Sequence, residues 1–350
     1  KMSSTHTQIR EQYGRSETLE SWQYVDGMGR KLGSVSEDNN GYIFAGGQLF
    51  NGKGGVRYSF EAIPLSSIDY PTLNLLSQVN SQLHYDASGR GIWSQSSADK
   101  KGQRAVTRTE YQPLFTTVID ANGNRQTTAL DGLKRTIEAH EYNQGEIFTT
   151  RYQHNAVGKL TQVTDAQNNI KTMTYDGLSR KTAMNDPDNG LTKYVFDNIS
   201  NLIEITDNKN QVIQFKYDEI SRPLSEDFKG KAGIEVRYEY DDATADYPGA
   251  DNVVGKLAAV HDQSGSVFFS YDQRGNSLWQ IKRLQGKDYR FSTTYDAMGR
   301  IVQQAWPDGE SIVYQYDKRG LVKSIPGIID SFNYGITGQI DQTHFANGVN

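Results

Sequence analysis

Tyr175-Asp-Gly-Leu-Ser-Arg180, Phe196-Asp-Asn-Ile-Ser-Asn201 and Tyr217-Asp-Glu-Ile-Ser-Arg222 are three copies of one short motif. In each copy an aromatic residue and an aspartate precede a turn-forming segment. The copies recur every 21 residues, and His154 occupies the aromatic position one period earlier. A fixed period of about 20 residues indicates a repeat architecture. The prediction for the whole chain therefore starts from this motif.

Related copies lie on both sides of this stretch. The predicted repeat positions are Tyr24, Tyr85, Asp86, Arg90, Tyr175, Asp176, Arg180, Phe196, Asp197, Tyr217, Asp218, Arg222, Tyr240, Asp241, Tyr271, Asp272, Tyr295, Asp296, Gly299, Arg300, Tyr316, Asp317 and Gly320. Degenerate copies occur at Leu130-Asp131 with Arg135, and at Tyr334. We expect the aromatic residues to support a sheet, and the aspartates with the closing glycine or arginine to hold its turns.

A second bulky residue stands two positions before the aromatic residue in most copies, as Met173 does before Tyr175. This spacing places both side chains on one face of a β-strand, whereas a helix would separate them by about 200°. Aspartate suits the start of a turn because its carboxylate can accept a backbone N–H bond from two residues further on. Each period is therefore predicted to be a β-hairpin.

The composition supports an all-β fold. Hydrophobic residues make up only 36% of the 350 residues, but 21 of the residues are tyrosine, which favours strands, and 33 are glycine, which favours turns. About twelve hairpins give on the order of 24 strands and ~115 Å of sheet. Open sheets rarely exceed about ten strands without curling. We therefore predict a repeat array of β-hairpins that forms a long, curved, spiralling sheet, part or all of a hollow shell.

The regularity of the motif changes along the chain. Residues 1–128 are predicted to hold irregular repeats with an insert at 33–83, and residues 129–350 a regular array. We expect one continuous shell rather than independent domains. A short helix is predicted over Pro71–Val79. Two longer intervals indicate insertions near Asp246–Gly249 and Leu284–Lys287.

The sequence lacks the signals that are typical of several functional classes. The net charge is −5 with no basic run, which argues against nucleic-acid binding, and no stretch approaches the ~20 apolar residues of a membrane helix. There is no cysteine, and the six histidines lack metal-ligand spacing. Two loops that begin at Asp120 and Asp186 resemble calcium loops faintly but lack the glutamate at the twelfth position. We predict no catalytic, cofactor or metal site, and no enzymatic activity.

The motif resembles the YD or Rhs (rearrangement hotspot) repeat. Tyr295-Asp-Ala-Met-Gly-Arg300 and Tyr316-Asp-Lys-Arg-Gly-Leu321 are close matches, and the early copy Gln23–Arg30 with its irregular surroundings is similar to the B component of bacterial toxin complexes. The resemblance implies a hollow β-shell, which in those proteins encloses a toxin polypeptide and in teneurins carries adhesion surfaces. The family's self-cleaving site has no counterpart here, because Asp186-Pro187 lies inside the array.

The leading hypothesis is a non-catalytic segment of an Rhs/YD shell that encapsulates and protects a toxin or effector before delivery. Its expected partners are the enclosed polypeptide and neighbouring shell segments or toxin-complex subunits. Because Lys1 precedes Met2, we expect a segment of a larger protein, and the resemblance implies that this protein is bacterial and secreted or on the cell surface. The alternatives are a structural or adhesive scaffold that binds a surface partner and, as a third class, a carbohydrate-binding or hydrolytic β-repeat protein.

Overall fold

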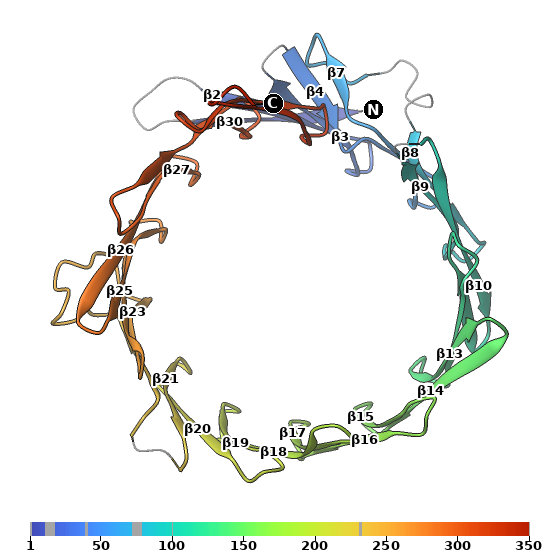
Figure 1. Cartoon of the computed structure of the whole chain (residues 1–350). Coiled ribbons are helices and arrows are strands. Elements are labelled where there is room, and N and C mark those ends of the chain that lie inside the picture. Colours follow the sequence, from blue (N-terminus) through green and yellow to red (C-terminus); the bar gives the residue numbers. More distant parts are fainter. Residues whose placement is uncertain are drawn as a thin grey trace. The chain divides into compact units, whose positions relative to one another are not determined.

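The computed structural model describes residues 2–10, 18–38, 41–71, 79–99, 101–230 and 233–349 (Figure 1). These residues form strands, turns and connections without a helix, so none of them could cross a membrane as a helix. The all-β prediction is confirmed. The predicted helix over Pro71–Val79 falls mostly on residues 72–78, outside the described residues. The chain divides into two compact units, Lys1–Thr109 with Phe291–Asn350, and Glu110–Arg290.

The unit Glu110–Arg290 contains one antiparallel sheet in which the strands follow one another in chain order (Figure 1). Its strands are β11 (Phe115–Ile119), β12 (Arg125–Leu130), β13 (Thr136–Asn143), β14 (Glu146–His154), β15 (Leu160–Thr164), β16 (Ile170–Tyr175), β17 (Lys181–Asp186), β18 (Gly190–Phe196), β19 (Leu202–Thr206), β20 (Val212–Tyr217), β21 (Pro223–Phe228), β22 (Val236–Tyr240), β23 (Leu257–Asp262), β24 (Gly265–Tyr271) and β25 (Ser277–Leu284). Most of the connections are short turns, so the predicted array of hairpins is confirmed.

The pleat gives this sheet two chemically different faces. One face, which we call the apolar face, carries directly opposed pairs such as Met173 with Met184 and Ile205 with Ile213. The other, the polar face, carries pairs such as Gln162 with Thr172 and Glu204 with Gln214. The tyrosines at 175 and 217 lie on the apolar face, two residues after Met173 and Phe215. The pairing register therefore supports the same-face arrangement predicted from the spacing.

A loop between β22 and β23 covers part of the polar face. Tyr247 of this loop packs on Phe268 with ring centroids 4.6 Å apart, and the Asp251 amide donates to the Ser270 hydroxyl at 2.9 Å. Phe268 and Ser270 are fully buried beneath it. The insertion predicted near Asp246 is thus an ordered element packed on the sheet.

The interval around Leu284–Lys287 differs from its prediction. β25 and β26 (Lys287–Tyr295) are joined there by a two-residue turn, with φ of 51° at Gln285 and 77° at Gly286. Positive φ at both positions is the backbone of a tight hairpin turn, which matches the twist of the flanking strands. The extra length of this interval lies in the two long strands and not in an inserted loop.

The other unit contains several smaller sheets. One sheet has the order β1-β2-β3-β4-β7, with β1 (Ser3–Arg10), β2 (Thr18–Val25), β3 (Lys31–Asp38), β4 (Gly41–Ala45) and β7 (Ile63–Leu65). The remaining strands are β5 (Gln48–Phe50), β6 (Val56–Phe60), β8 (Val79–Tyr85), β9 (Gly91–Ala98), β27 (Ile301–Ala305), β28 (Ser311–Val313), β29 (Gln315–Tyr316), β30 (Val322–Ser324), β31 (Ile329–Tyr334) and β32 (Ile340–Phe345). The boundaries between the units fall within β10 (Arg104–Gln112) and β26.

This unit has a compact aromatic core on its first sheet. Trp22, Tyr24, Val35 and Phe44 are buried together, and Val35 and Phe44 are fully inaccessible to solvent. Gly33 is required by close packing, because a Cβ atom there would lie 2.3 Å from the Phe44 ring. Early and late parts of the chain meet in the same unit, where Arg319 forms an ion pair with Asp38 at 3.1 Å.

Candidate functional site: a ladder of tyrosine, aspartate and arginine

Each regular repeat ends in a turn that is held by its aspartate. In the turn Asp176–Arg180, Asp176 Oδ1 accepts the backbone N–H groups of Leu178 and Arg180, both at 2.9 Å. Asp176 Oδ2 accepts Arg180 Nε at 2.7 Å. The same set of bonds occurs in the turns that begin at Asp26, Asp86, Asp131, Asp218 and Asp296.

The fourth residue of these turns adopts a left-handed backbone. Its φ is 65° at Ser179, 65° at Ser221 and 79° at Gly299. Glycine adopts this conformation without strain, whereas serine does so at a cost. The turn therefore has glycine in some repeats and a small polar residue in others.

Hydrogen bonding lowers the pKa of two of the turn carboxylates, Asp176 and Asp241. The pKa of Asp176 lies below its ordinary value because the carboxylate accepts backbone and guanidinium hydrogen bonds from Arg180. The pKa of Asp241 falls to about 2, chiefly through Arg222 and then through the Gly255 N–H. Asp176 and Asp241 are thus turn acceptors in their ionised form, whereas a general acid needs a pKa near neutrality.

The arginine of one repeat also contacts the next repeat. The Arg180 guanidinium lies 5.0 Å from the centroid of the Phe196 ring and donates to the Asp197 carbonyl at 2.7 Å. Arg222 likewise lies 4.4 Å from the Tyr240 ring. Arg300 lies over Tyr316 at the same distance, in the other unit. One side chain therefore closes its own turn and stacks on the following aromatic residue.

The tyrosine of a repeat reaches back to the preceding one. The hydroxyl groups of Tyr175 and Tyr217 donate to the carbonyls of Leu160 and Leu202, at 2.8 and 2.9 Å. Corresponding bonds from a repeat tyrosine to the start of an earlier strand occur at Tyr85, Tyr271, Tyr316 and Tyr334. Burial raises the pKa of Tyr217, so its hydroxyl stays protonated and can donate. We call this chain of contacts from tyrosine, aspartate and arginine the ladder.

Some predicted positions differ from the regular ladder. Tyr24 stands one residue earlier relative to its aspartate than the other tyrosines, and Val25 takes the position opposite Lys31. Tyr24 therefore lies in the buried core and donates to the Ile68 carbonyl. Asn201 and Asn276 replace arginine in the turns at Asp197 and Asp272. In the turn at Asp317 and Gly320, Leu321 takes the place of arginine, so this residue donates only its backbone N–H to Asp317.

Asp241 is a different kind of exception. Its own φ is 72°, and the inserted loop separates it from Lys256, whose carbonyl accepts the Asp241 N–H at 3.2 Å. The carboxylate accepts from the Gly255 amide at 2.7 Å and from Arg222 at 3.0 Å. The ladder thus continues across the insertion, with Arg222 as the link, because the loop returns the chain to the same place.

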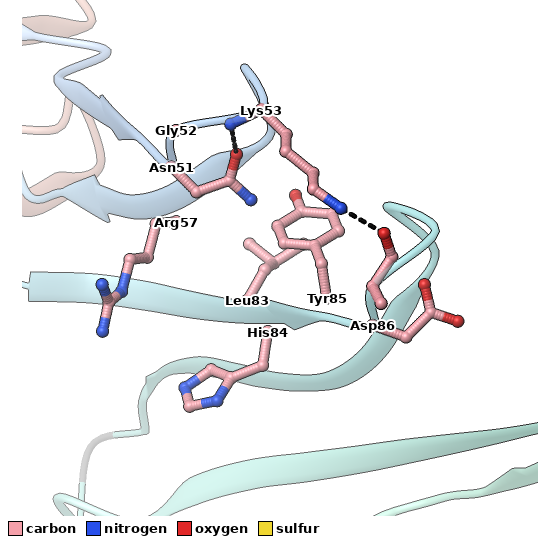
Figure 2. Close-up of a pocket in the computed structure, with 9 residues that line it drawn as sticks. Asn51, Gly52, Lys53, Arg57, Leu83, His84, Tyr85 and Asp86 are labelled. Atoms are coloured by element: carbon pink, nitrogen blue, oxygen red, sulfur yellow. Dashed lines mark hydrogen bonds between the residues drawn. The ribbon is translucent and has the colours of Figure 1, made fainter.

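A shallow pocket in the unit Lys1–Thr109 with Phe291–Asn350 lies next to the ladder residues Tyr85 and Asp86 (Figure 2). The Lys53 side chain extends from the Asn51 turn and donates to the Ala87 carbonyl in the Asp86 turn. Tyr85 donates to the Val56 carbonyl at 2.8 Å beside it. Lys53 thus joins two turns beside this pocket, and Tyr85 joins two strands.

Two histidines sit in arrangements that superficially resemble hydrolase sites. His261 Nδ1 lies 2.8 Å from Ser266 Oγ, and its Nε2 lies 3.3 Å from Glu239. His140 has a similar pair of neighbours in Thr149 and Glu138. In both cases the hydroxyl residue is directly opposite the histidine on the neighbouring strand, so the contact follows from the pairing register. Among the described residues, no group of three or more acidic or histidine side chains is placed to hold a metal ion.

Comparison with known proteins identifies the repeat. Residues 149–191 match the sequence model of a family described as RHS Repeat, and this range includes the turn Asp176–Arg180. No curated protein matches the chain significantly. The ladder residues Tyr175, Asp176 and Arg180 therefore lie in the stretch that carries the family's sequence signal.

Solved structures match over nearly the whole chain. A crystal structure of TcdB2-TccC3 has a TM-score of 0.85 and 19% identity over 99% of this chain and 21% of its own. A Photorhabdus luminescens Tc holotoxin pore with a substituted TccC3 has a TM-score of 0.82 and 18% identity over 99% and 20% of the two chains. This chain spans about a fifth of the length of the solved chains. The resemblance drawn from the sequence is thus confirmed: the protein carries an RHS repeat, in a fold similar to that of the toxin-complex structures.

Proposed function

We propose that this chain is a non-catalytic wall segment of an Rhs/YD shell that encloses a toxin or effector polypeptide until its delivery. The observation that carries the proposal is the apolar face of the sheet in Glu110–Arg290. Its side chains, such as Met184, Tyr194 and Phe215, are half-buried and not fully covered. A long apolar face that is not fully buried is suited to contact with an unfolded polypeptide, which exposes apolar side chains of its own.

The backbone hydrogen bonds of such a wall are formed within its own sheet. Consecutive strands from β11 to β25 pair with one another, so their N–H and C=O groups bond within the sheet. An enclosed chain would therefore meet side chains and not unpaired backbone, which would otherwise template strand pairing with the cargo. This supports containment in preference to tight, sequence-specific binding.

The comparisons support the proposed context. The solved chains of similar fold come from structures described as TcdB2-TccC3 and as a Tc holotoxin pore. We therefore propose a secreted or cell-surface toxin complex as the setting, with neighbouring shell segments or toxin-complex subunits as partners. The absence of enzymatic activity is part of the same proposal and rests on the ladder, whose aspartates are engaged in turns.

A binding experiment with face-specific variants tests the proposal. The purified chain is titrated into a fluorescently labelled, permanently unfolded polypeptide, and binding is followed by fluorescence anisotropy. Phe215→Glu and Met184→Glu place a charge on the apolar face and are expected to weaken binding at least tenfold. Lys193→Glu and Gln214→Glu on the polar face are the matched controls and should leave it unchanged.

The result can also contradict the proposal. If the wild-type chain does not bind the unfolded polypeptide, or if variants on both faces weaken binding equally, the apolar face is not a cargo surface. Far-UV circular dichroism and the melting temperature of each variant establish that the sheet is intact. A panel of glycan, peptide and ester substrates tests the non-catalytic part, which turnover abolished by one carboxylate substitution would overturn.

A further inference from the structure

The turns at one rim of the sheet in Glu110–Arg290 carry a row of exposed aliphatic side chains. We define the YD rim as the five consecutive turns 131–135, 155–159, 176–180, 197–201 and 218–222. Their third residues are the aliphatic residues of this row. These residues and their exposed fractions are Leu133 (72%), Val157 (71%), Leu178 (68%), Ile199 (65%) and Ile220 (71%). Single exposed aliphatic residues are common, but five consecutive ones at the same place in each turn are not.

The turn itself does not require an aliphatic residue there. The third residue contributes its backbone N–H, which donates to the turn aspartate or asparagine at 2.9 Å for Leu178 and 3.1 Å for Val157. The opposite rim has turns with the same bond, from the N–H of Gln167 to Asp165 at 2.8 Å and from Lys209 to Asp207 at 2.9 Å. The third residues of the turns 120–124, 165–169, 186–190 and 207–211 on that rim are polar and exposed: Asn122, Gln167, Asp188 and Lys209. At this position of the turn, the aliphatic residues therefore belong to the YD rim, whereas the exposed aliphatic residues near the opposite rim, such as Ile170 and Leu191, lie on strands.

The row has a fixed spacing. Adjacent turns on one rim are separated by two strands, or about 9.6 Å, so five turns span roughly 38 Å. Arg135 and Arg180 donate to carbonyls of the next turn, at 3.1 and 2.7 Å, which holds neighbouring turns in register. A partner that covers all five side chains at once must present apolar groups with the same period. A second antiparallel array of hairpins has this period, and a second copy of this chain would present such an array.

From this we infer that the YD rim is a self-association surface, which joins two copies of this chain rim to rim about a two-fold axis. In such a contact Leu178, at the centre of the row, meets Leu178 of the second copy, and Val157 meets Ile199. The end of the row that carries Lys134 in one copy then meets the end that carries Glu219 in the second copy. Opposite charges thus face each other in the antiparallel arrangement, whereas a parallel one would oppose like charges.

The size of the contact is sufficient for a specific interface. Burying one aliphatic side chain removes on the order of 100 Å² from water. Five from each copy give about 1,000 Å² in total, the size at which specific interfaces begin. Gly132, Ala156 and Gly177 precede the aliphatic residues in three of the turns, and their small size lets a second row approach closely.

Sedimentation equilibrium of the whole chain tests the inference. The wild-type chain is expected to dimerise at micromolar concentration. Leu178→Asp would bring two carboxylates together at the axis and should raise the dimer dissociation constant at least tenfold. Gln167→Asp is the matched control, because it makes the same change at the same position of a turn on the opposite rim, and it should have no effect.

A charge exchange tests the orientation. Lys134→Glu and Glu219→Lys should each weaken the dimer, and the double variant should restore it. A wild-type chain that stays monomeric at 100-fold higher concentration, about 0.1 mM, would overturn the inference. So would a dimer that Leu178→Asp and Gln167→Asp affect equally, because association would then use another surface. An unchanged melting temperature of Leu178→Asp establishes that the fold is retained.

Discussion

The Tyr217 hydroxyl donates to the carbonyl of Leu202, 15 residues earlier in the chain, at 2.9 Å. Leu202 is the first residue of β19, directly after the turn that Asp197 closes. The bond therefore ties the aromatic residue of one repeat to the end of the previous turn. The arginine contacts run in the opposite direction, from one repeat to the next. Each repeat is therefore bonded to both of its neighbours.

Removing this hydroxyl group should weaken the sheet modestly. Tyr217→Phe keeps the ring and loses one hydrogen bond to a partly buried carbonyl, so we expect a loss of about 1 kcal/mol in the free energy of unfolding. Chemical denaturation monitored by circular dichroism measures it. Tyr152→Phe is the control, since no described residue accepts a hydrogen bond from Tyr152; an equal loss there would mean that the Leu202 carbonyl is not the cause.

The fourth residue of the turn should show opposite effects in different repeats. Ser221 and Gly299 both have left-handed backbone, with φ of 65° and 79°. Ser221→Gly relieves strain and should stabilise by about 1 kcal/mol, while Gly299→Ser should destabilise by a similar amount. Gly299→Val should cost more, because a β-branched side chain disfavours positive φ. Equal melting temperatures for the three variants and the wild type would contradict this account.

Acid should weaken the link between Arg222 and Asp241. The folded-state pKa of Asp241 is lowered from 3.8 to about 2, so the pair contributes stability above the unfolded-state pKa, and this contribution is lost as the pH falls through the folded-state value. We expect the melting temperature to fall between pH 4 and about pH 2. In Asp241→Asn this part of the decline should be absent. Melting curves of both proteins across this range measure the difference.

Truncation should cost most where a ring is fully buried. Phe268 is 1% exposed, so Phe268→Ala should cost about 3–5 kcal/mol. Tyr295 is only half-buried, and Tyr295→Ala should cost less, about 1–3 kcal/mol. Denaturant unfolding of the two variants gives the comparison. A larger loss at Tyr295 than at Phe268 would show that the ladder, and not burial under the inserted loop, dominates stability.

The arrangement of the ladder could be predicted from the sequence only in part. The turn bonds join residues two and four positions apart, so the motif Asp176–Arg180 contains all of their atoms. The bond from Tyr175 to the Leu160 carbonyl joins residues 15 positions apart, and the contact of Arg180 with Phe196 joins residues 16 positions apart. They depend on a register shift that places Tyr175 opposite Lys181, and the sequence spacing does not reveal it.

The sequence by itself determined the hairpin period, the strand faces and the aspartate turns, because each depends on residues within a few positions of one another. Only the tertiary structure decided that Tyr24 enters a buried core, that the loop containing Tyr247 covers the polar face, and that the exposed aliphatic residues align on one rim. These features arise when residues some 20 or more positions apart are brought together by strands paired in a definite register. Local chemistry leaves that register open, and the packing of the whole sheet fixes it.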